Sequence, residues 1–316
     1  MTTLRLGTRR SALATTQSTW VAERLRALGH AVELVEITTE GDVSTQPLTQ
    51  IGGTGVFTSA IRAGLHGDRV DLAVHSLKDL PTAPDPGLVV AAVPSREDSR
   101  DVLVARDGLT LAELPPGSVV GTGSPRRAAQ LTALGLGLDV RPIRGNVDTR
   151  VGYVSSGTLD AVVLARAGLA RLGRLELVTE VLDPIQMLPA PGQGALAVEC
   201  RADRADVRAA VAPLDDPDTR TCVTAERALL SALEAGCTAP IGALAEIVDG
   251  EDGLELSLRA FAGSADGSIA LRRSLVGPLT DPRALGNRLA QILLDDGAAG
   301  IEAPSPTATH HSEPVS

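Results

Sequence analysis

The stretch that decides the fold is LRLGTRRSALATTQSTWVAERLRALGHAVELVEITT, residues 4–39. Its first five residues predict a strand, and residues 11–29 have the apolar spacing of an amphipathic helix. Ser11 suits the N-cap of this helix and Gly29 its end. A second apolar run follows at residues 31–39. Strand, helix and strand in this order predict an α/β unit with a parallel sheet and right-handed crossovers.

The same pattern continues along the chain, although no sequence repeat is visible. The first unit continues with a predicted helix at 56–67 and a buried strand at 70–76. A second α/β unit is predicted from strands at 101–106, 117–124 and 139–145, a helix at 125–135, and a strand leading into a helix at 159–173. Helices at 219–236 and 281–298 with strands at 254–263 and 270–277 predict a small α+β domain. The polar, Pro-rich residues 304–316 predict a disordered tail.

Composition excludes several classes of protein. The net charge of −10 and the aromatic content of 1% argue against a nucleic-acid partner. The chain has no run of about 18 apolar residues and no signal peptide, so we expect no membrane span and a soluble cytoplasmic protein. Three scattered cysteines provide neither a disulfide framework nor the ligand spacing of a zinc site, and we expect no metal.

Polar side chains follow four of the predicted strands. Because ligands bind at the carboxyl ends of strands in such sheets, these side chains predict an anion-binding cleft. Ser124 can cap a helix that begins at Pro125, and a helix N-terminus favours an anion. Arginine forks at this place would suit a ligand with several carboxylates. The strand-end residues are Arg9, Arg10, Ser11, His75, Ser76, Lys78, Asp79, Thr122, Ser124, Arg126, Arg127, Arg144, Asn146 and Arg150.

Two neighbours in this set, Lys78 and Asp79, are candidates for chemistry. Lys78 is the single lysine among 29 basic residues, which points to a specific need for an ammonium group, although chance survival explains it equally well. A carboxylate among arginines stays ionised and suits stabilisation of a developing cation. A surface ion pair of little energetic value is the equally weighted alternative.

Cys237 lies in LEAGCTAPIGA, residues 233–243, after the helix of the third domain. A thiol in such a loop is a candidate nucleophile or covalent anchor. No histidine is near it in the sequence, which weakens the interpretation as a thiol hydrolase. Cys200, in an apolar run, and Cys222, on the predicted helix, are expected to be buried structural residues.

Seven motifs in order resemble porphobilinogen deaminase, also called hydroxymethylbilane synthase, between residues 8 and 243. They are TRRSALA, VHSLKDLPT, REDSRDVL, GTGSPRRAAQL, RGNVDTR, LPAPGQGALAVECR and LEAGCTAPIGA. The resemblance implies a transferase that joins four porphobilinogen molecules head to tail, releases ammonia and then hydrolyses the linear hydroxymethylbilane. It also implies a monomer.

The resemblance also implies roles for particular residues. Cys237 would carry a dipyrromethane cofactor through a thioether, and Asp79 would be the catalytic carboxylate that stabilises cationic intermediates. Expected cofactor-binding residues are Ser76, Lys78, Thr122, Ser124, Arg126, Arg127 and Arg144. Expected substrate-binding residues are Arg9, Ser11, Arg150 and Arg171.

The implied fold has two α/β domains of the type II periplasmic-binding-protein kind with a cleft between them, and a third α+β domain. The expected domains are residues 1–97 with 195–214, residues 98–194, and residues 217–303. The chain departs from the family at Gln50 and Thr54, where many relatives have lysines, and at Glu40, where a basic residue is usual.

Two other functions remain open from the residues alone. One is an anion-binding protein of the same architecture without catalysis. The other is an enzyme that uses Lys78 as a Schiff base with a carbonyl substrate. The adjacent Asp79 would keep the Lys78 ammonium charged, which disfavours the second.

Overall fold

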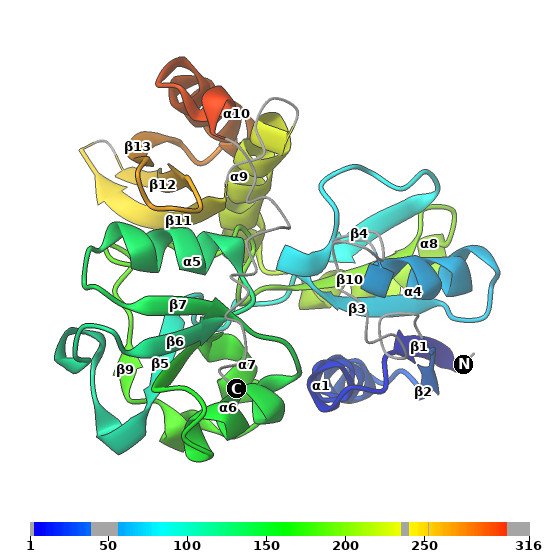
Figure 1. Ribbon diagram of the computed structural model, residues 1–316. Helices are drawn as coiled ribbons and strands as arrows, with labels where there is room; N and C mark the ends of the chain where they lie inside the picture. The colour runs from blue at the N-terminus through cyan, green and yellow to red at the C-terminus, as the bar shows by residue number, and fades with distance from the viewer. Residues whose placement is uncertain (1–2, 39–55, 235–239, 252, 302–316) are drawn as a thin grey trace.

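The computed structural model describes residues 3–38, 56–234, 240–251 and 253–301. Two α/β units lie side by side, and a third unit lies above the second (Figure 1). The predicted class of two α/β domains and a small α+β domain is confirmed. Gln50, Thr54, Glu40, Cys237 and the predicted tail at 304–316 lie outside the described residues.

The first unit is a five-stranded sheet of order β2-β1-β3-β10-β4. Its strands are β1 (Leu4–Thr8), β2 (Val32–Glu36), β3 (Leu72–Ser76), β4 (Leu88–Ala92) and β10 (Leu196–Arg201). Its helices are α1 (Ala12–Ala27), α4 (Val56–His66) and α8 (Ala205–Val211). Leu6, Leu72 and Val198 are buried in its core.

The second unit repeats this order as β7-β6-β8-β5-β9. Its strands are β5 (Asp101–Ala105), β6 (Val119–Thr122), β7 (Asp139–Pro142), β8 (Ala161–Ala165) and β9 (Glu180–Val181). Its helices are α5 (Pro125–Ala133), α6 (Val147–Ser155) and α7 (Arg166–Arg171). The two units therefore share one topology without a visible sequence repeat.

Both sheets are mixed, so the expectation of parallel sheets was wrong for two strands. In the first sheet β10 lies between β3 and β4 and is antiparallel to both. In the second sheet β5 lies between β8 and β9, again antiparallel to both. The chain reaches each of these strands from the other unit: residues 93–100 lead from β4 to β5, and residues 182–195 lead from β9 to β10. Because the chain arrives from the other unit, the strand runs opposite to its neighbours.

The third unit has the antiparallel sheet β11-β12-β13 covered by two helices. Its elements are α9 (Pro217–Glu234), β11 (Ile241–Gly250), β12 (Gly253–Gly263), β13 (Ala270–Pro278) and α10 (Pro282–Asp295). In Figure 1, α9 stands above the junction of the two α/β units. Phe261 packs against Ala129 of α5, which joins the third unit to the second.

The sequence pattern missed β4, β9, β11, α6 and α8. β11 begins within the motif around Cys237 and contains small residues, so its alternation was hidden. Cys200 and Cys222 are both buried free thiols, as predicted. The strands of each sheet fall within the predicted domain ranges, and the exact domain bounds stay a prediction.

Candidate functional site

In the described part of the two α/β units, three helices with a side-chain N-cap begin at the carboxyl ends of strands, as the sequence pattern indicated for two of them. Ser11 Oγ accepts the Ala14 amide at 3.3 Å, at the start of α1 after β1. Ser124 caps α5 after β6, with Pro125 as the first helical residue. The third cap was not foreseen: it is Asn146, at the start of α6 after β7. The two units thus present strand-to-helix corners of the same kind.

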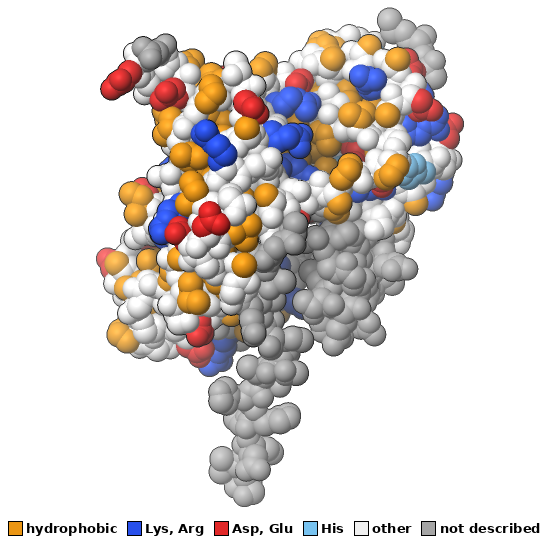
Figure 2. Space-filling model, turned by 90° about the horizontal axis from the view of Figure 1, so that it is seen from above, with side chains coloured by type: hydrophobic (Ala, Val, Ile, Leu, Met, Phe, Trp, Pro, Cys, Tyr) orange, Lys and Arg blue, Asp and Glu red, His pale blue; other side chains and the backbone are white. Residues whose placement is uncertain are grey.

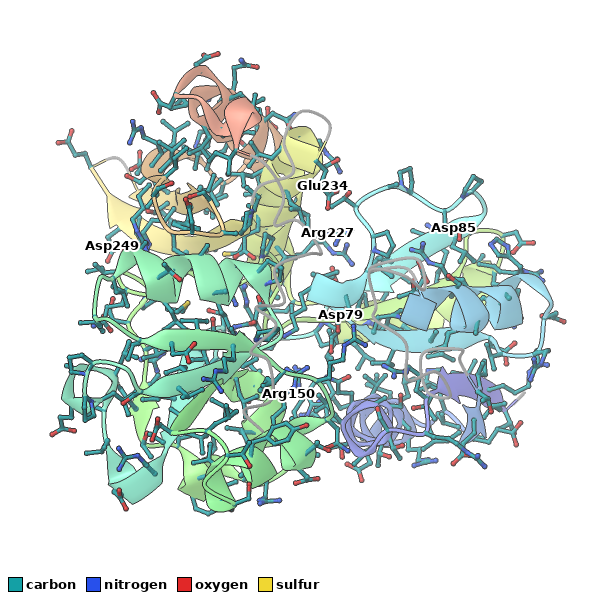
Figure 3. The ribbon with its side chains drawn as sticks, in the orientation of Figure 1. Asp79, Asp85, Arg150, Arg227, Glu234 and Asp249 are labelled. Atoms are coloured by element: carbon teal, nitrogen blue, oxygen red, sulfur yellow. The ribbon has the colours of Figure 1, made fainter. Side chains whose placement is uncertain are left out.

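Lys78 and Asp79 lie in a short 3₁₀ turn, Leu77–Asp79, directly after β3. Lys78 is half-buried, and its Nζ donates to Gln193 Oε1 at 3.4 Å. Burial lowers the pKa of Lys78 to about 8. The charge of Arg127 also lowers this pKa, whereas the Asp79 carboxylate raises it. Asp79 is exposed at the edge of the first unit, and Arg150 lies at the facing edge of the second (Figure 3).

Arg126 and Arg127 point into the second unit instead of lying open at its surface. Both are buried, and their Nη2 atoms donate to Asp101 at 2.8 and 2.7 Å. Burial by itself would raise the pKa of Asp101. The positive charges of the two guanidinium groups have the larger effect and hold this pKa well below its usual range. The expectation that both arginine forks face an anion is therefore corrected in part, because one face of each fork already binds Asp101.

The Nε edge of each guanidinium, unlike the Nη2 atoms that bind Asp101, lacks a hydrogen-bond acceptor among the described residues. The Nε atoms of Arg126, Arg127 and Arg150 are buried and have no hydrogen-bond partner among the described residues. A buried donor left without an acceptor costs about 1–3 kcal/mol. Arg127 interacts electrostatically with both Arg126 and Arg150, so the three donors belong to one group of residues. Bound water or a ligand can supply the acceptors that such donors need.

Arg150 of α6 brings a further charge to this group. Burial lowers the pKa of Arg150, and the neighbouring charges of Arg127 and Arg144 lower it further. Arg144 itself is exposed. At Gly123 an added Cβ would lie 2.7 Å from the Ile143 carbonyl and 3.5 Å from Arg150 Nη2. Glycine is therefore needed at residue 123 because the Ile143 carbonyl leaves no room for a Cβ.

The other predicted residues have mixed environments. Arg171 donates to the Gly194 carbonyl at 2.7 Å, on the second connection between the sheets, and burial lowers its pKa. Ser76 Oγ accepts from Gln17 of α1 at 2.9 Å. Thr122 Oγ1 accepts the Ser124 amide at 3.2 Å, so it shapes the corner before α5. The remaining predicted residues are Arg9, which is half-buried, Arg10, which pairs with Glu36, and His75, which is buried 3.2 Å from Glu199.

Sequence reasoning missed Asp101 and Gln193. Gln193 Nε2 donates to Asp101 Oδ1 at 2.8 Å and to the Ser99 carbonyl at 2.7 Å, while its oxygen accepts from Lys78. Gln193 thereby links the lysine of the first unit to the arginine pair of the second. Both residues lie within quoted motifs, REDSRDVL and LPAPGQGALAVECR, and that was the signal that could have found them.

Two cavities of the described part lie away from this group of residues. The larger, of about 500 Å³, is lined by residues 96–100 together with parts of α9 and β11. The second is lined by His66, Gly87 and residues 201–203. The predicted cleft thus stays a prediction. Blue and red side chains are interspersed over the face seen in Figure 2.

Within the ranges that the structure covers, no three His, Cys, Asp or Glu side chains are grouped to hold a metal ion. None of the described helices is long and apolar enough to cross a membrane.

Comparison with known proteins assigns the chain to a family. Residues 4–209 match the family model "Porphobilinogen deaminase, dipyromethane cofactor binding domain", and residues 220–295 match "Porphobilinogen deaminase, C-terminal domain". The chain belongs to the porphobilinogen deaminase family. The sequence resemblance is thereby confirmed.

Individual porphobilinogen deaminases match over nearly the whole chain. The protein of that name from Mycobacteroides abscessus is 59% identical, covering 94% of this chain and 99% of its own length. The one from Mycobacterium tuberculosis is 60% identical, covering 93% and 97%. Among solved structures, the methionine-binding protein MetQ aligns with a TM-score of 0.43 at 11% identity, covering 73% of this chain and 94% of that one.

The dipyrromethane of porphobilinogen deaminases fits the residues described above. This cofactor carries carboxylate side chains, which are acceptors for the unpartnered Nε atoms of Arg126, Arg127 and Arg150. Lys78 lies within electrostatic range of the first two, so its ammonium adds to the same field. Lys78 and the three arginines carry more positive charge than Asp79 and Asp101, whose negative charges act on Lys78, can neutralise.

Proposed function

We propose that this porphobilinogen deaminase is a hydroxymethylbilane synthase of the transferase class (EC 2.5.1.61), with Asp79 as its catalytic residue. The observation that carries the proposal is that Lys78, next to Asp79, lies within electrostatic range of Arg126 and Arg127. The buried Nε donors of these two arginines and of Arg150 have no partner among the described residues. The reaction joins four porphobilinogen molecules, each with an acetate and a propionate, and releases four ammonia molecules. A site with an excess of arginine suits the carboxylates that accumulate on the growing chain.

We propose that Cys237 holds the dipyrromethane through a thioether. The side chains expected to bind its carboxylates are Lys78, Ser124, Arg126, Arg127 and Arg144, with Ser76 and Thr122 beside them. When bound, the dipyrromethane supplies the pyrrole carbon to which the first substrate unit is joined. Arg9, Ser11, Arg150 and Arg171 would bind the carboxylates of the incoming porphobilinogen.

The chemistry of Asp79 follows from its exposure and its neighbours. Porphobilinogen brings an ammonium group, and its C–N bond breaks with the electron pair leaving on nitrogen. The carboxylate of Asp79, beside Lys78 in the turn, stabilises the positive charge that develops on the pyrrole. It can accept the proton that is lost when the new carbon–carbon bond forms. The Schiff-base alternative has no comparable support from the family match.

We propose that the enzyme acts as a monomer in the cytoplasm, without nucleic-acid partners. Cys200 and Cys222 are free thiols, which suits a reducing compartment. Light scattering of the purified protein at micromolar concentration measures the molecular mass. A dimer mass would refute the monomer.

The test of Asp79 is the Asp79→Asn variant. We expect kcat to fall by about 10²–10⁴-fold, because the charge that assists ammonia loss is gone, while porphobilinogen is still bound. Stopped-flow or single-turnover assays of ammonia release give kcat separately from KM. Full activity of the variant would refute the assigned role.

The test of Cys237 is the intact mass of the purified enzyme followed by peptide mapping. We expect added mass equal to two porphobilinogen-derived units on the peptide that contains Cys237. A Cys237→Ser protein should lack this mass and the activity. An unmodified Cys237 in an active enzyme would contradict the proposal.

A further inference from the structure

The turn that carries Asp79 is held by a side chain from the third unit. Arg227, in the middle of α9, donates Nη1 to the Leu80 carbonyl at 2.9 Å and to the Leu77 carbonyl at 3.3 Å. Its Nη2 donates to the Pro81 carbonyl at 2.7 Å. One guanidinium thus binds backbone oxygens on both sides of Asp79 (Figure 3).

The position of Asp79 depends on this backbone. Its carboxylate makes no hydrogen bond with any side chain in the part of the chain that the structure describes, so among these residues the backbone of the turn sets where it lies. The turn has one internal bond, from the Leu80 amide to the Leu77 carbonyl at 3.2 Å, and one to the Ala195 carbonyl at 3.0 Å. Arg227 supplies the hydrogen bonds to the carbonyls that follow Asp79.

The same face of α9 makes two further contacts with this segment. Val223 packs in one cluster with Leu77 and Leu80. Glu234, the last residue of α9, accepts a hydrogen bond from the Thr82 hydroxyl. Positions 223, 227 and 234 are four and seven residues apart, so they share one helix face. Cys237 comes three positions after the end of this helix in the sequence.

We propose that Arg227 is a positioning residue for the reaction, which fixes the Asp79 turn against the helix that leads to the cofactor cysteine. This inference rests on the proposed roles of Asp79 and Cys237. The planar guanidinium suits the task because its five donors lie in one rigid plane and bind several carbonyls at once. A displacement of about 1 Å in a reacting group costs about 100-fold in rate.

The test compares Arg227→Gln with Arg220→Gln. Arg220 is on the same helix but binds Asp215, with hydrogen bonds of 2.7–2.9 Å. We expect Arg227→Gln to lower kcat by about 30–100-fold with KM changed by less than about threefold. Arg220→Gln should keep kcat within about twofold, and Arg227→Lys should recover part of the loss because one or two of the bonds can re-form.

Hydrogen exchange gives a second readout that needs no activity. In cofactor-free protein, the amides within residues 77–82 (all except Pro81, which has none) should exchange faster in Arg227→Gln than in the wild type or Arg220→Gln, because the turn opens locally more often. Intact mass tells whether each variant carries dipyrromethane. Faster exchange at 77–82 supports the inference even for a variant that does not load its cofactor.

The outcomes separate this inference from the proposed function. Arg227→Gln with the kcat of Arg220→Gln, or with unchanged exchange at 77–82, overturns the positioning role. If Asp79→Asn is inactive in that case, the proposed function stands without the inference. If Asp79→Asn is fully active, the role of Asp79 fails, and so does positioning through it.

Discussion

Lys78 is the single lysine of the chain, and it lies where two units meet. Its ammonium is affected by Asp79 on the same turn and by Asp101, Arg126 and Arg127 of the second unit. A guanidinium at this place would stay protonated at every accessible pH, whereas an ammonium can lose its proton when buried. With lysine at this position, the protonation of the side chain therefore depends on whether ligand carboxylates are bound beside it.

The pKa of Lys78 can be measured directly. Reductive methylation with [¹³C]formaldehyde labels one lysine, so its NMR signal is unambiguous apart from the N-terminal amine. We expect a midpoint near pH 8 in cofactor-free protein, because burial lowers the pKa. Carboxylates of bound dipyrromethane should raise it. A midpoint near the ordinary value of about 10.4 in the cofactor-free protein would contradict the burial described here.

The sign of the pH effect on stability follows from the same shift. Between pH 8 and the ordinary lysine value the unfolded chain binds more protons than the folded chain. The contribution of Lys78 to the unfolding free energy therefore becomes more favourable as pH rises through this window.

At the scale of an element, α5 shows how one local signal led to a different arrangement from the one expected. The cap at Ser124 and the helix start at Pro125 form as predicted. Arg126 and Arg127 follow them, yet both reach Asp101 at the start of β5, a strand that enters from the other unit. Their place is thus fixed by an ion pair with a residue about 25 positions away.

Asp101→Asn tests this arrangement. The substitution leaves two buried guanidinium groups without their counter-charge, and we expect the unfolding free energy to fall by about 3–5 kcal/mol at pH 7. Urea unfolding measures it. Asp139→Asn, which breaks an exposed pair with Arg141, should have no measurable effect and serves as the control.

Acid should reduce the difference between the wild type and Asp101→Asn. The folded-state pKa of Asp101 is lowered, so its contribution is fully present above the unfolded value of about 4 and is lost as pH falls below it. The same urea series at pH 7 and pH 3.5 should show a smaller difference at the lower pH. A difference that does not shrink would mean that the ion pair is not its source.

At the scale of the whole molecule, one buried carboxylate ties the three units together. Glu226 of α9 binds Arg96 of the first connection at 2.7 and 3.0 Å. It also accepts the Gly192 amide of the second connection at 2.6 Å and the Ala245 amide of β11 at 2.9 Å. Both connections between the α/β units are therefore fixed to the third unit at one side chain.

Glu226→Gln tests this junction. The amide keeps the shape but removes the charge opposite Arg96, and we expect the unfolding free energy to fall by about 3 kcal/mol. The denaturant unfolding transitions followed by circular dichroism and by activity should then no longer coincide, because the three units are no longer held together by the hydrogen bonds of Glu226. Glu246→Gln, at an exposed pair with Arg259, should leave a single transition and is the control.

The sequence by itself determined what depends on near neighbours. A few adjacent residues are enough to predict strand β3, the helix caps at Ser11 and Ser124, and the burial of Cys200. The sequence motifs were also specific enough to indicate the family. The tertiary structure decided the strand directions of β5 and β10, the binding of Arg126 and Arg127 to Asp101, and the contact of Arg227 with a turn 146 residues away. These contacts join residues far apart in the chain, and only the folding of the two connections brings them together.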